Sequence, residues 1–329
     1  MKYLVVGSGS IGKRRIGILN DLGITSIDIC DKSETRMDDV CQKYRVEGRY
    51  TDYAVALAKK PDVVIICTPP VFHISIAKAA VEAGAGLMIE KPLAHNLDGV
   101  DSLIKLIQKK KAIAGVAYTL RFHKGVNLLR NIVEQKIIGK VYSVRAECGQ
   151  YLPDWHPWED YRNWYMSKKN EGGGAILDIS HEIDYVRWLL GDAKEVGCFY
   201  GTISDLQMDA DDVAEILLRF KSGAISSIHL DLLQRDYRRN CEIIGEKGTV
   251  LWDYTTKQIK VFTKEKGCWE TIEYKEERSD MFVEETKHFI KCFEKKAQIM
   301  VSVEDAAKTL AIAASAKESS DSKKIVILP

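Results

Sequence analysis

Residues 1–15 read MKYLVVGSGSIGKRR. The apolar run Tyr3–Val6 has the composition of a buried strand, and the pattern G-x-G-x-x-G follows it at once, before a helical run over residues 11–22. Between a strand and a helix, this pattern is typical of a dinucleotide-binding turn. Gly7 permits the tight turn, Gly9 lets a pyrophosphate approach the backbone, and Gly12 lets helix and strand pack closely.

The start of that helix supplies backbone N–H groups and a partial positive charge to phosphates, through residues such as Ser10 and Ile11. We expect Arg14 and Arg15 to add charge one turn further along. Asp31 ends the next predicted strand, 19 residues after Gly12. A carboxylate there accepts from the ribose 2′-OH and repels a 2′-phosphate. The predicted cofactor is therefore NAD, with NADP less favoured.

The first 120 residues alternate short Val- and Ile-rich runs with helical runs, which predicts a doubly wound parallel sheet with helices on both faces. Gly23 and Gly84 stand where helices should end, and Asn96 where a helix should begin. From about residue 121 strand signals follow one another in series, which predicts a second α/β domain with a large, mainly antiparallel open sheet. The expected domains are residues 1–120 for the cofactor and 121–329 for substrate binding and oligomerisation.

Glu90-Lys91-Pro92 closes the buried strand predicted over residues 86–89. In an open parallel sheet the ligand crevice lies beyond the carboxyl ends of the strands. A lysine placed there can act as an acid or base, so Lys91 is a candidate catalytic residue. The alternative is an exposed lysine at a strand end, which is where most lysines lie.

A second candidate is the helix predicted over residues 175–190, which the glycine triplet 172–174 precedes. Asp178 and His181 stand three apart and would share a helix face, where the carboxylate could orient the imidazole. The glycines would let a ligand or another backbone come close. The alternative is that His181 is an ordinary core or capping residue.

Six aromatic residues fall between Tyr151 and Tyr165, in a chain that is 9% aromatic overall. Flat rings with polar tips, interleaved with hydrogen-bond donors, suit a sugar. The candidate substrate residues here are Tyr151, Trp155, Arg162 and Trp164. Lys124 and the segment 235–239 are further candidates for an anionic substrate group. The alternative is a loop that packs its own aromatics or forms a subunit contact.

Charge and composition exclude several classes of protein. Lys and Arg total 48 against 47 Asp and Glu, so a strong basic excess for nucleic acid or an anionic membrane is missing. The longest uncharged stretch, residues 63–77, is shorter than a membrane-spanning helix. The eight cysteines lack metal-ligand spacing, so we expect free thiols and no metal site. With no signal core before the first strand, the expected location is cytoplasmic.

Four segments together resemble the glucose–fructose oxidoreductase / inositol dehydrogenase family, called Gfo/Idh/MocA. They are GSGSIGKRR at 7–15, CTPPVFH at 67–73, EKP at 90–92 and GGGAILDISHEID at 172–184. The resemblance implies a Rossmann domain, an open-sheet α/β domain that often mediates oligomers, and NAD(P)-dependent redox chemistry at a sugar or polyol carbon. It also implies Lys91 as the catalytic lysine and His181 with Asp178 in a second catalytic motif.

The same resemblance implies that Thr68, Pro69 and His73 line the cofactor cleft next to Glu90 and Lys91, and that Arg121 and His181 lie at the substrate. Two departures stand out: many members have the Asp and His four apart, and Pro70 replaces a residue that is polar in many relatives. The segments SHEID and WHPWEDYR resemble relatives linked to surface-polysaccharide and nonulosonic-acid sugars.

We therefore expect an NAD(H)-dependent oxidoreductase acting on a sugar, and within that class on an amino sugar or a nucleotide-linked sugar. Lys91 or His181 would take the hydroxyl proton, and Asp178 would orient His181. A polyol (inositol-type) dehydrogenase or a transient-oxidation lyase is an alternative within the family. A non-catalytic dinucleotide sensor is an alternative of another class. A bare face of the open sheet predicts a homodimer or homotetramer.

Overall fold

A computed structural model describes all 329 residues, which form two compact units. One unit comprises Met1–Tyr118 and Phe282–Ala307, and the other comprises Thr119–Met281 and Lys308–Pro329. The division into domains at residue 120 remains a prediction. It did not include the return of the chain to the first unit over residues 282–307.

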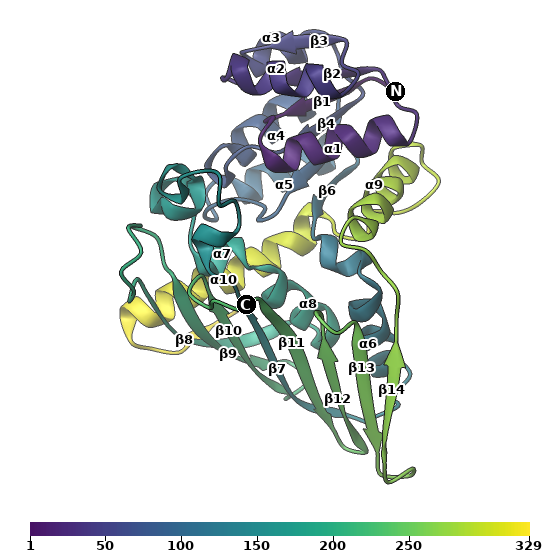
Figure 1. The fold of residues 1–329 in the computed structure, drawn as a ribbon, viewed down its shortest axis with the longest axis vertical. Helices are drawn as coiled ribbons and strands as arrows, with labels where there is room; N and C mark the ends of the chain where they lie inside the picture. Colours follow the sequence, from purple (N-terminus) through teal and green to yellow (C-terminus); the bar gives the residue numbers. More distant parts are fainter. The chain divides into compact units, whose positions relative to one another are not determined.

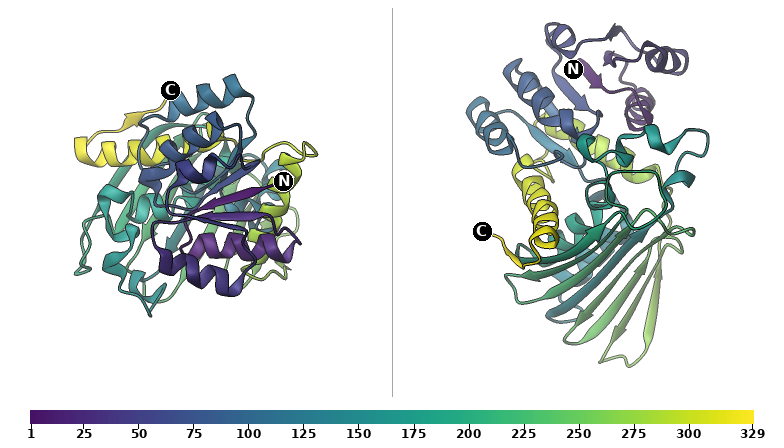
Figure 2. Two further views of the ribbon diagram at one scale, coloured as in Figure 1. Left: turned by 90° about the horizontal axis from the view of Figure 1, so that it is seen from above. Right: turned by 90° about the vertical axis from the view of Figure 1, so that its left-hand side faces the viewer.

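The first unit contains a six-stranded parallel sheet with the order β3-β2-β1-β4-β5-β6. Its strands are β1 Tyr3–Val6, β2 Ile27–Cys30, β3 Gly48–Tyr50, β4 Val63–Ile66, β5 Gly86–Glu90 and β6 Ala114–Ala117. Its helices are α1 Ser10–Asp21, α2 Glu34–Lys43, α3 Tyr53–Leu57, α4 His73–Glu82, α5 Val100–Lys110 and most of α9 Asp280–Phe293. This is the doubly wound arrangement that the alternating pattern predicts, with helices on both faces (Figures 1 and 2).

Strand alternation explains the two covered faces. Tyr3 and Val5 pack with Ile16 of α1, Met37 of α2 and Phe289 of α9 in one core cluster. The intervening strand residues are buried too, and the pleat directs them to the opposite face. The returning segment extends this unit at β6, where the Val116 N–H donates to the Val301 carbonyl at 3.0 Å.

The second unit contains a nine-stranded sheet with the order β14-β13-β12-β11-β7-β10-β9-β8-β15. Its strands are β7 Val141–Gly149, β8 Ala193–Gly201, β9 Val213–Phe220, β10 Ile225–Asp231, β11 Arg238–Gly245, β12 Gly248–Asp253, β13 Gln258–Thr263, β14 Trp269–Glu273 and β15 Val326–Ile327. All neighbours are antiparallel except β7 and β10. The mainly antiparallel open sheet is therefore confirmed.

Helices cover one face of this sheet (Figure 2). They are α6 Lys124–Glu134, α7 Ala175–Asp178, α8 His181–Leu190 and α10 Val303–Ser322, whose first turn belongs to the first unit. On β9 the residues alternate strictly between buried and exposed, with Ile216 and Leu218 inside and Leu217 outside. The uncovered face exposes 83% of Phe199 and 60% of Leu217.

Four local predictions differ from the structure. The helix expected to start near Asn96 begins only at Val100, because Asn96 instead accepts from the Asp98 N–H in a tight turn. The apolar run over residues 112–120 has the composition of a strand throughout, but the strand spans only Ala114–Ala117. Strands β3, β12 and β14 have no counterpart among the expected elements; β3 is three residues long, and β14 is exposed along its whole length. The fourth difference is a break in the helix over residues 175–190, which concerns the site itself.

No helix has both the length and the apolar surface needed to cross a membrane.

Candidate functional site

The glycine turn joins β1 to α1 at the carboxyl edge of the parallel sheet. Gly7 has φ +97°, and a Cβ there would lie 2.6 Å from the Cys67 carbonyl oxygen. A Cβ on Gly12 would lie 1.9 Å from the Gly7 carbonyl oxygen, so both positions require glycine. Gly9 differs, since a Cβ there meets nothing within 4 Å. The open space lies at the one glycine whose predicted role is to admit a pyrophosphate.

Asp31 lies beside this turn. Its carboxylate accepts from the backbone N–H and the hydroxyl of Ser8, at 2.7 and 2.8 Å, and from the Ser33 N–H at 2.9 Å. The carboxylate is therefore held at the end of β2 and in contact with the glycine loop. That is the position from which an acidic residue reaches a ribose diol.

Thr68, Pro69 and His73 follow β4 at the same edge. The Thr68 Oγ1 is buried and has no hydrogen-bond partner, which is rare for a hydroxyl unless a bound group or water completes it. Together with the space at Gly9, this orphaned oxygen fits a dinucleotide lying across the edge. Gly7, Gly9, Ser10, Ile11 and Gly12 would hold its phosphates, and Asp31 its ribose.

His73 is completely buried, and both ring nitrogens face backbone carbonyls. Nε2 lies 2.8 Å from the Thr68 oxygen, and Nδ1 lies 3.0 Å from the Pro92 oxygen. Burial lowers the pKa of this imidazole, although the carbonyls act in the opposite direction. The ring is engaged within the protein, between the loops that follow β4 and β5. The cofactor contact expected of His73 stays a prediction.

Arg15 corrects an expectation. Its guanidinium is fully buried and does not lie at the phosphate turn's surface. Nε donates to Glu90 at 2.7 Å, one terminal nitrogen donates to Glu285 at 2.6 Å, and the other donates to the Thr286 hydroxyl at 3.2 Å. The charge of Arg15, which we expected to face phosphates, is therefore paired with carboxylates inside the unit. The same pairing engages the carboxylate of Glu90, which we expected to contact the cofactor.

Lys91 follows β5 directly, partly buried, at the carboxyl edge that carries the glycine turn and Thr68. One sheet edge thus gathers the predicted acid/base lysine and the whole predicted cofactor set. This gathering follows from the topology, because the carboxyl ends of parallel strands all lie at the same edge of the sheet.

The second catalytic motif lies in the other unit, and the helix expected there is interrupted. It consists of α7, which ends at Asp178, and α8, which begins at His181, with a turn at Ile179 and Ser180. Asp178 and His181 therefore do not occupy one continuous helix face, contrary to our expectation. The Asp178 carboxylate accepts from the Tyr165 hydroxyl at 2.8 Å.

Asp211 explains where α7 begins. Its carboxylate accepts from the Ile176 N–H at 2.9 Å and from Lys317, and its carbonyl accepts from the Ala175 N–H. A Cβ on Gly174, which has φ +106°, would lie 2.3 Å from that carboxylate. A Cβ on Gly173 would lie 2.3 Å from the backbone oxygens of Tyr165 and Met166. The glycine triplet thus lets another backbone come close, one of the two possibilities that the sequence left open.

Arg121 is buried and makes a bidentate pair with Asp184 of α8, at 2.7 and 2.8 Å. Thr309 also donates to Asp184, at 3.1 Å. Arg239 is likewise paired in the interior, with Glu182 at 2.8 Å. The contact of segment 235–239 with an anionic substrate group stays a prediction. The substrate contact expected of Arg121 stays a prediction.

The aromatic segment is a series of short turns with mixed exposure. Arg162 grips Asp160 through three contacts of 2.7–2.9 Å, and the Trp164 indole donates to Glu159 at 3.1 Å. The Trp155 indole N–H is buried without a partner. Arg235 stacks 3.5 Å over the Tyr151 ring. Backbone pairing between Leu152 and Leu232, at 2.9 Å, holds the two loops together.

Sequence reasoning missed several contributors to these sites. In the sequence Tyr165 is one member of the aromatic cluster, and its bond to Asp178 spans 13 residues. Glu285 lies 270 residues from its partner Arg15. Neither pair leaves a periodic signal, so only the folded chain identifies them.

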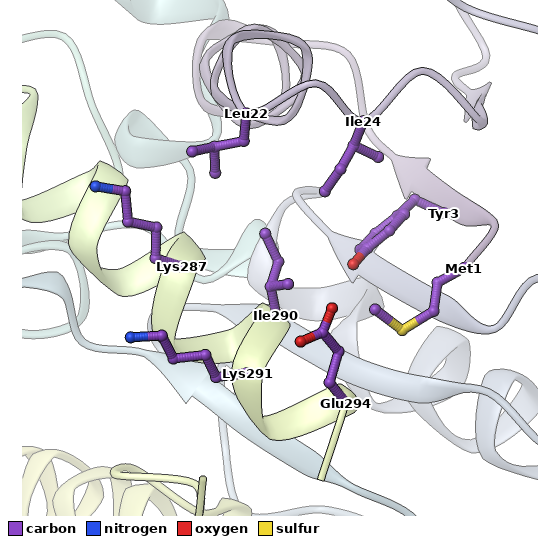
Figure 3. A pocket seen from close by; sticks show the side chains of 8 residues that line it. All are labelled: Met1, Tyr3, Leu22, Ile24, Lys287, Ile290, Lys291 and Glu294. Carbon is purple, nitrogen blue, oxygen red and sulfur yellow. The ribbon is translucent and has the colours of Figure 1, made fainter. Parts of the chain in front are cut away.

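A hollow elsewhere on the first unit is not part of this edge (Figure 3). It is lined by Met1, Tyr3, Leu22, Ile24, Lys287, Ile290, Lys291 and Glu294. These residues gather at the amino end of β1, opposite the glycine turn, and burial raises the pKa of Tyr3 to about 12. Ligands of open parallel sheets bind at the carboxyl ends, so this hollow is not the expected cofactor site.

Comparisons with known proteins agree with this geometry. Residues 1–118 match the family model described as "Oxidoreductase family, NAD-binding Rossmann fold", and residues 126–251 match the GFO/IDH/MocA C-terminal domain. The chain is 29% identical to myo-inositol 2-dehydrogenase of Thermotoga maritima, over 97% of this chain and 98% of that protein.

Two solved structures share the fold over the whole chain. Levoglucosan dehydrogenase in complex with NADH has a TM-score of 0.90 at 22% identity, covering 100% of this chain and 99% of that one. The WlbA dehydrogenase of Bordetella pertussis, in complex with NADH and UDP-GlcNAcA, has a TM-score of 0.85 at 21% identity, with the same coverage.

Proposed function

Because the chain belongs to the GFO/IDH/MocA family of NAD-binding oxidoreductases, we propose that it interconverts a hydroxyl and a ketone on a sugar or polyol. The observation that carries this proposal is the gathering of Lys91, Thr68 and the glycine turn at one edge of the parallel sheet. Bound NAD⁺ would supply the two-electron oxidation, and the protein's task is to bind, orient and move protons.

Within this proposal, Lys91 takes the proton of the substrate hydroxyl and returns it in the reverse direction. His181, the first residue of α8, is the second acid/base group. The turn at Ile179 and Ser180, which joins it to Asp178, holds it in place. The proton that Lys91 gains, together with a hydrogen bond from His181, stabilises the negative charge that develops on the substrate oxygen. The Asp178–Tyr165 bond attaches this motif to the aromatic segment, which we assign to the sugar.

For the substrate class, we propose a sugar that carries an anionic group, such as a nucleotide-linked amino sugar. Arg235 supports this choice. Its guanidinium stacks on Tyr151 and makes no hydrogen bond or ion pair in the structure, unlike Arg162 and Arg239. A stacked guanidinium with free N–H groups matches a phosphate or carboxylate. The orphaned Trp155 N–H lies in the loop paired with it and offers a further donor.

A neutral polyol is the second candidate. The full-length similarity to a myo-inositol 2-dehydrogenase favours it. A polyol would use the same acid/base groups and leave Arg235 without a role in binding.

The deciding experiment measures NADH formation from NAD⁺ with UDP-GlcNAcA, levoglucosan and myo-inositol. We expect turnover with the UDP-sugar, and we expect Arg235→Gln to raise its KM about 10-fold, the loss of one charge-assisted contact. The KM of a neutral sugar serves as the internal control and should not change. Turnover with myo-inositol alone would replace the anionic-sugar proposal by the polyol one. No turnover of any sugar or polyol would overturn both.

We also propose that the protein acts in the cytoplasm, where NAD is available.

A further inference from the structure

Lys91 stands between two residues that the interior of the first unit holds. Glu90, just before it, pairs with Arg15 of α1 at 2.7 Å. Pro92, just after it, places its carbonyl 3.0 Å from Nδ1 of His73, the first residue of α4. Both holding side chains have no exposed surface. The turn that carries Lys91 is therefore attached on each side to a different helix.

The Arg15 side also extends to a third helix. Its fork reaches Glu285 at 2.6 Å and Thr286 at 3.2 Å, both on α9. Two carboxylates share one guanidinium in a dry environment, so removing that guanidinium would cost far more than breaking an exposed ion pair. Only a planar guanidinium can make all three contacts at once. The arrangement defines where the Glu90 carboxylate, and hence the end of β5, must lie.

The His73 side connects two loops. Its other ring nitrogen, Nε2, lies 2.8 Å from the Thr68 carbonyl after β4, so one imidazole spans the ends of adjacent strands. A neutral imidazole has one N–H and can donate to only one of the two carbonyls, whereas the imidazolium donates to both. In either state the ring sets the distance between the loop of Thr68 and the turn of Lys91.

We propose that Arg15 and His73 are positioning residues, which hold Lys91 from both sides at the sheet edge. In this assignment they act on proton transfer through the Glu90–Pro92 turn and do not touch the reacting atoms. The inference rests on the proposed function, which gives Lys91 its role in proton transfer. Displacing a reacting group by about 1 Å costs about 10²-fold in rate, so losing either contact should lower the turnover rate measurably.

The test uses conservative variants of the full-length protein. Arg15→Lys keeps the buried charge and loses the fork, and His73→Gln keeps one donor and loses the bridge. His288→Gln is the matched control, because His288 also lies in the first unit and accepts a backbone N–H, from Met300 at 3.1 Å. If Arg15→Lys does not fold, Glu90→Gln tests the same side with a smaller change.

Two measurements separate positioning from general stability. The first is kcat per NADH-binding site, with the best substrate of the sugar panel. We expect a decrease of about 10- to 100-fold in both variants and less than two-fold in the control. The second needs neither substrate nor cofactor: the lysines are ¹³C-methylated, and the Lys91 signal is assigned with Lys91→Arg. We expect that signal to shift in Arg15→Lys and His73→Gln but not in His288→Gln.

A double-mutant cycle completes the argument. In a Lys91→Ala background, His73→Gln should cause no further loss of the residual rate, because the side chain that His73 positions is then absent. Full additivity would overturn the inference, as would unchanged kcat and an unmoved Lys91 signal in both variants. Retained activity of Lys91→Ala would instead refute the proposed function. The two failures are therefore distinguishable.

Discussion

Single residues at the sheet edge show how one side chain acquires a task from its neighbours. Arg14 and Arg15 are adjacent in sequence, yet Arg14 lies 4.4 Å over the Phe282 ring while Arg15 is buried between two carboxylates. Asp31, by contrast, stands where its spacing from the glycine turn predicts. Residue identity sets what chemistry is available, and burial decides whether a ligand or the protein uses it.

Lys91→Ala should abolish turnover and leave NADH affinity within a few-fold. The side chain follows β5 at the edge and is assigned to proton transfer, a contribution of about 10²–10⁴ in rate. Steady-state kinetics measure the turnover, and calorimetric titration measures the NADH affinity. A folded variant with most of its activity would contradict the assignment.

Asp31 should make the protein prefer NAD(H) over NADP(H) by about 10-fold or more, or about 1.4 kcal/mol. Its carboxylate is held next to the glycine loop by Ser8 and would repel a 2′-phosphate. Titration of both cofactors measures the ratio. Asp31→Asn keeps the acceptor oxygen and should narrow the preference, and equal binding by the unaltered protein would refute the role.

At the scale of elements, short turns and sheet registers decide which residues meet. The break between α7 and α8 separates Asp178 from His181, and the register of β10 with β9 places His229 opposite Glu215. Neither follows from residue type alone. Each produces an arrangement that a variant can test.

The aromatic segment should border the substrate. Trp155→Ala and Trp164→Ala, made separately, should each weaken substrate binding by about 1–3 kcal/mol, or roughly 5–150-fold, with little effect on NADH. The orphaned Trp155 N–H makes that variant the more informative one. Dissociation constants for both ligands provide the measurement. If substrate affinity is unchanged, or if the oligomer mass falls instead, the segment is a structural or subunit-contact loop.

His229 should stabilise the sheet in a pH-dependent manner. Its ring lies 2.6 Å from Glu215 and 3.0 Å from Asp231, and its pKa is raised to about 9, first by the Asp231 bond and then by Glu215. Because the folded pKa lies above the unfolded value of 6.5, the stabilisation is complete below that value. It is lost as the pH rises through about 9.

Urea unfolding of the native protein and of His229→Gln, at equal concentration, measures this contribution. The difference in unfolding free energy should be larger near pH 5.5 than near pH 10, values that lie roughly one unit beyond the unfolded and folded pKa of His229. An equal difference at both pH values would show that the ion pairs of His229 contribute nothing to the free energy of unfolding.

At the scale of the whole molecule, the prediction is a homodimer or homotetramer. Helices cover only one face of the nine-stranded sheet, and the other exposes Phe199 and Leu217 (Figure 2). An apolar patch on a broad sheet favours a second subunit. Light scattering at micromolar concentration should give a multiple of 37.1 kDa. Phe199→Lys with Leu217→Lys should lower that mass, whereas a monomeric native protein would contradict the prediction.

The fold class and the cofactor edge follow from the amino-acid sequence alone, because both depend on local patterns. Strand and helix periods, and glycines at fixed spacing, depend on neighbours within about 20 residues. The first 120 residues therefore predict a doubly wound sheet, residues 7–12 predict a glycine turn between strand and helix, and the structure has both.

The environments of the charged groups, in contrast, follow from the packing of distant segments. Arg15 meets Glu285 across 270 residues, Arg121 meets Asp184 across 63, and His73 joins two loops through backbone carbonyls. The return of residues 282–307 to the first unit is equally absent from any local pattern. Such contacts depend on which elements pack together, and burial then forces each charge to find a partner.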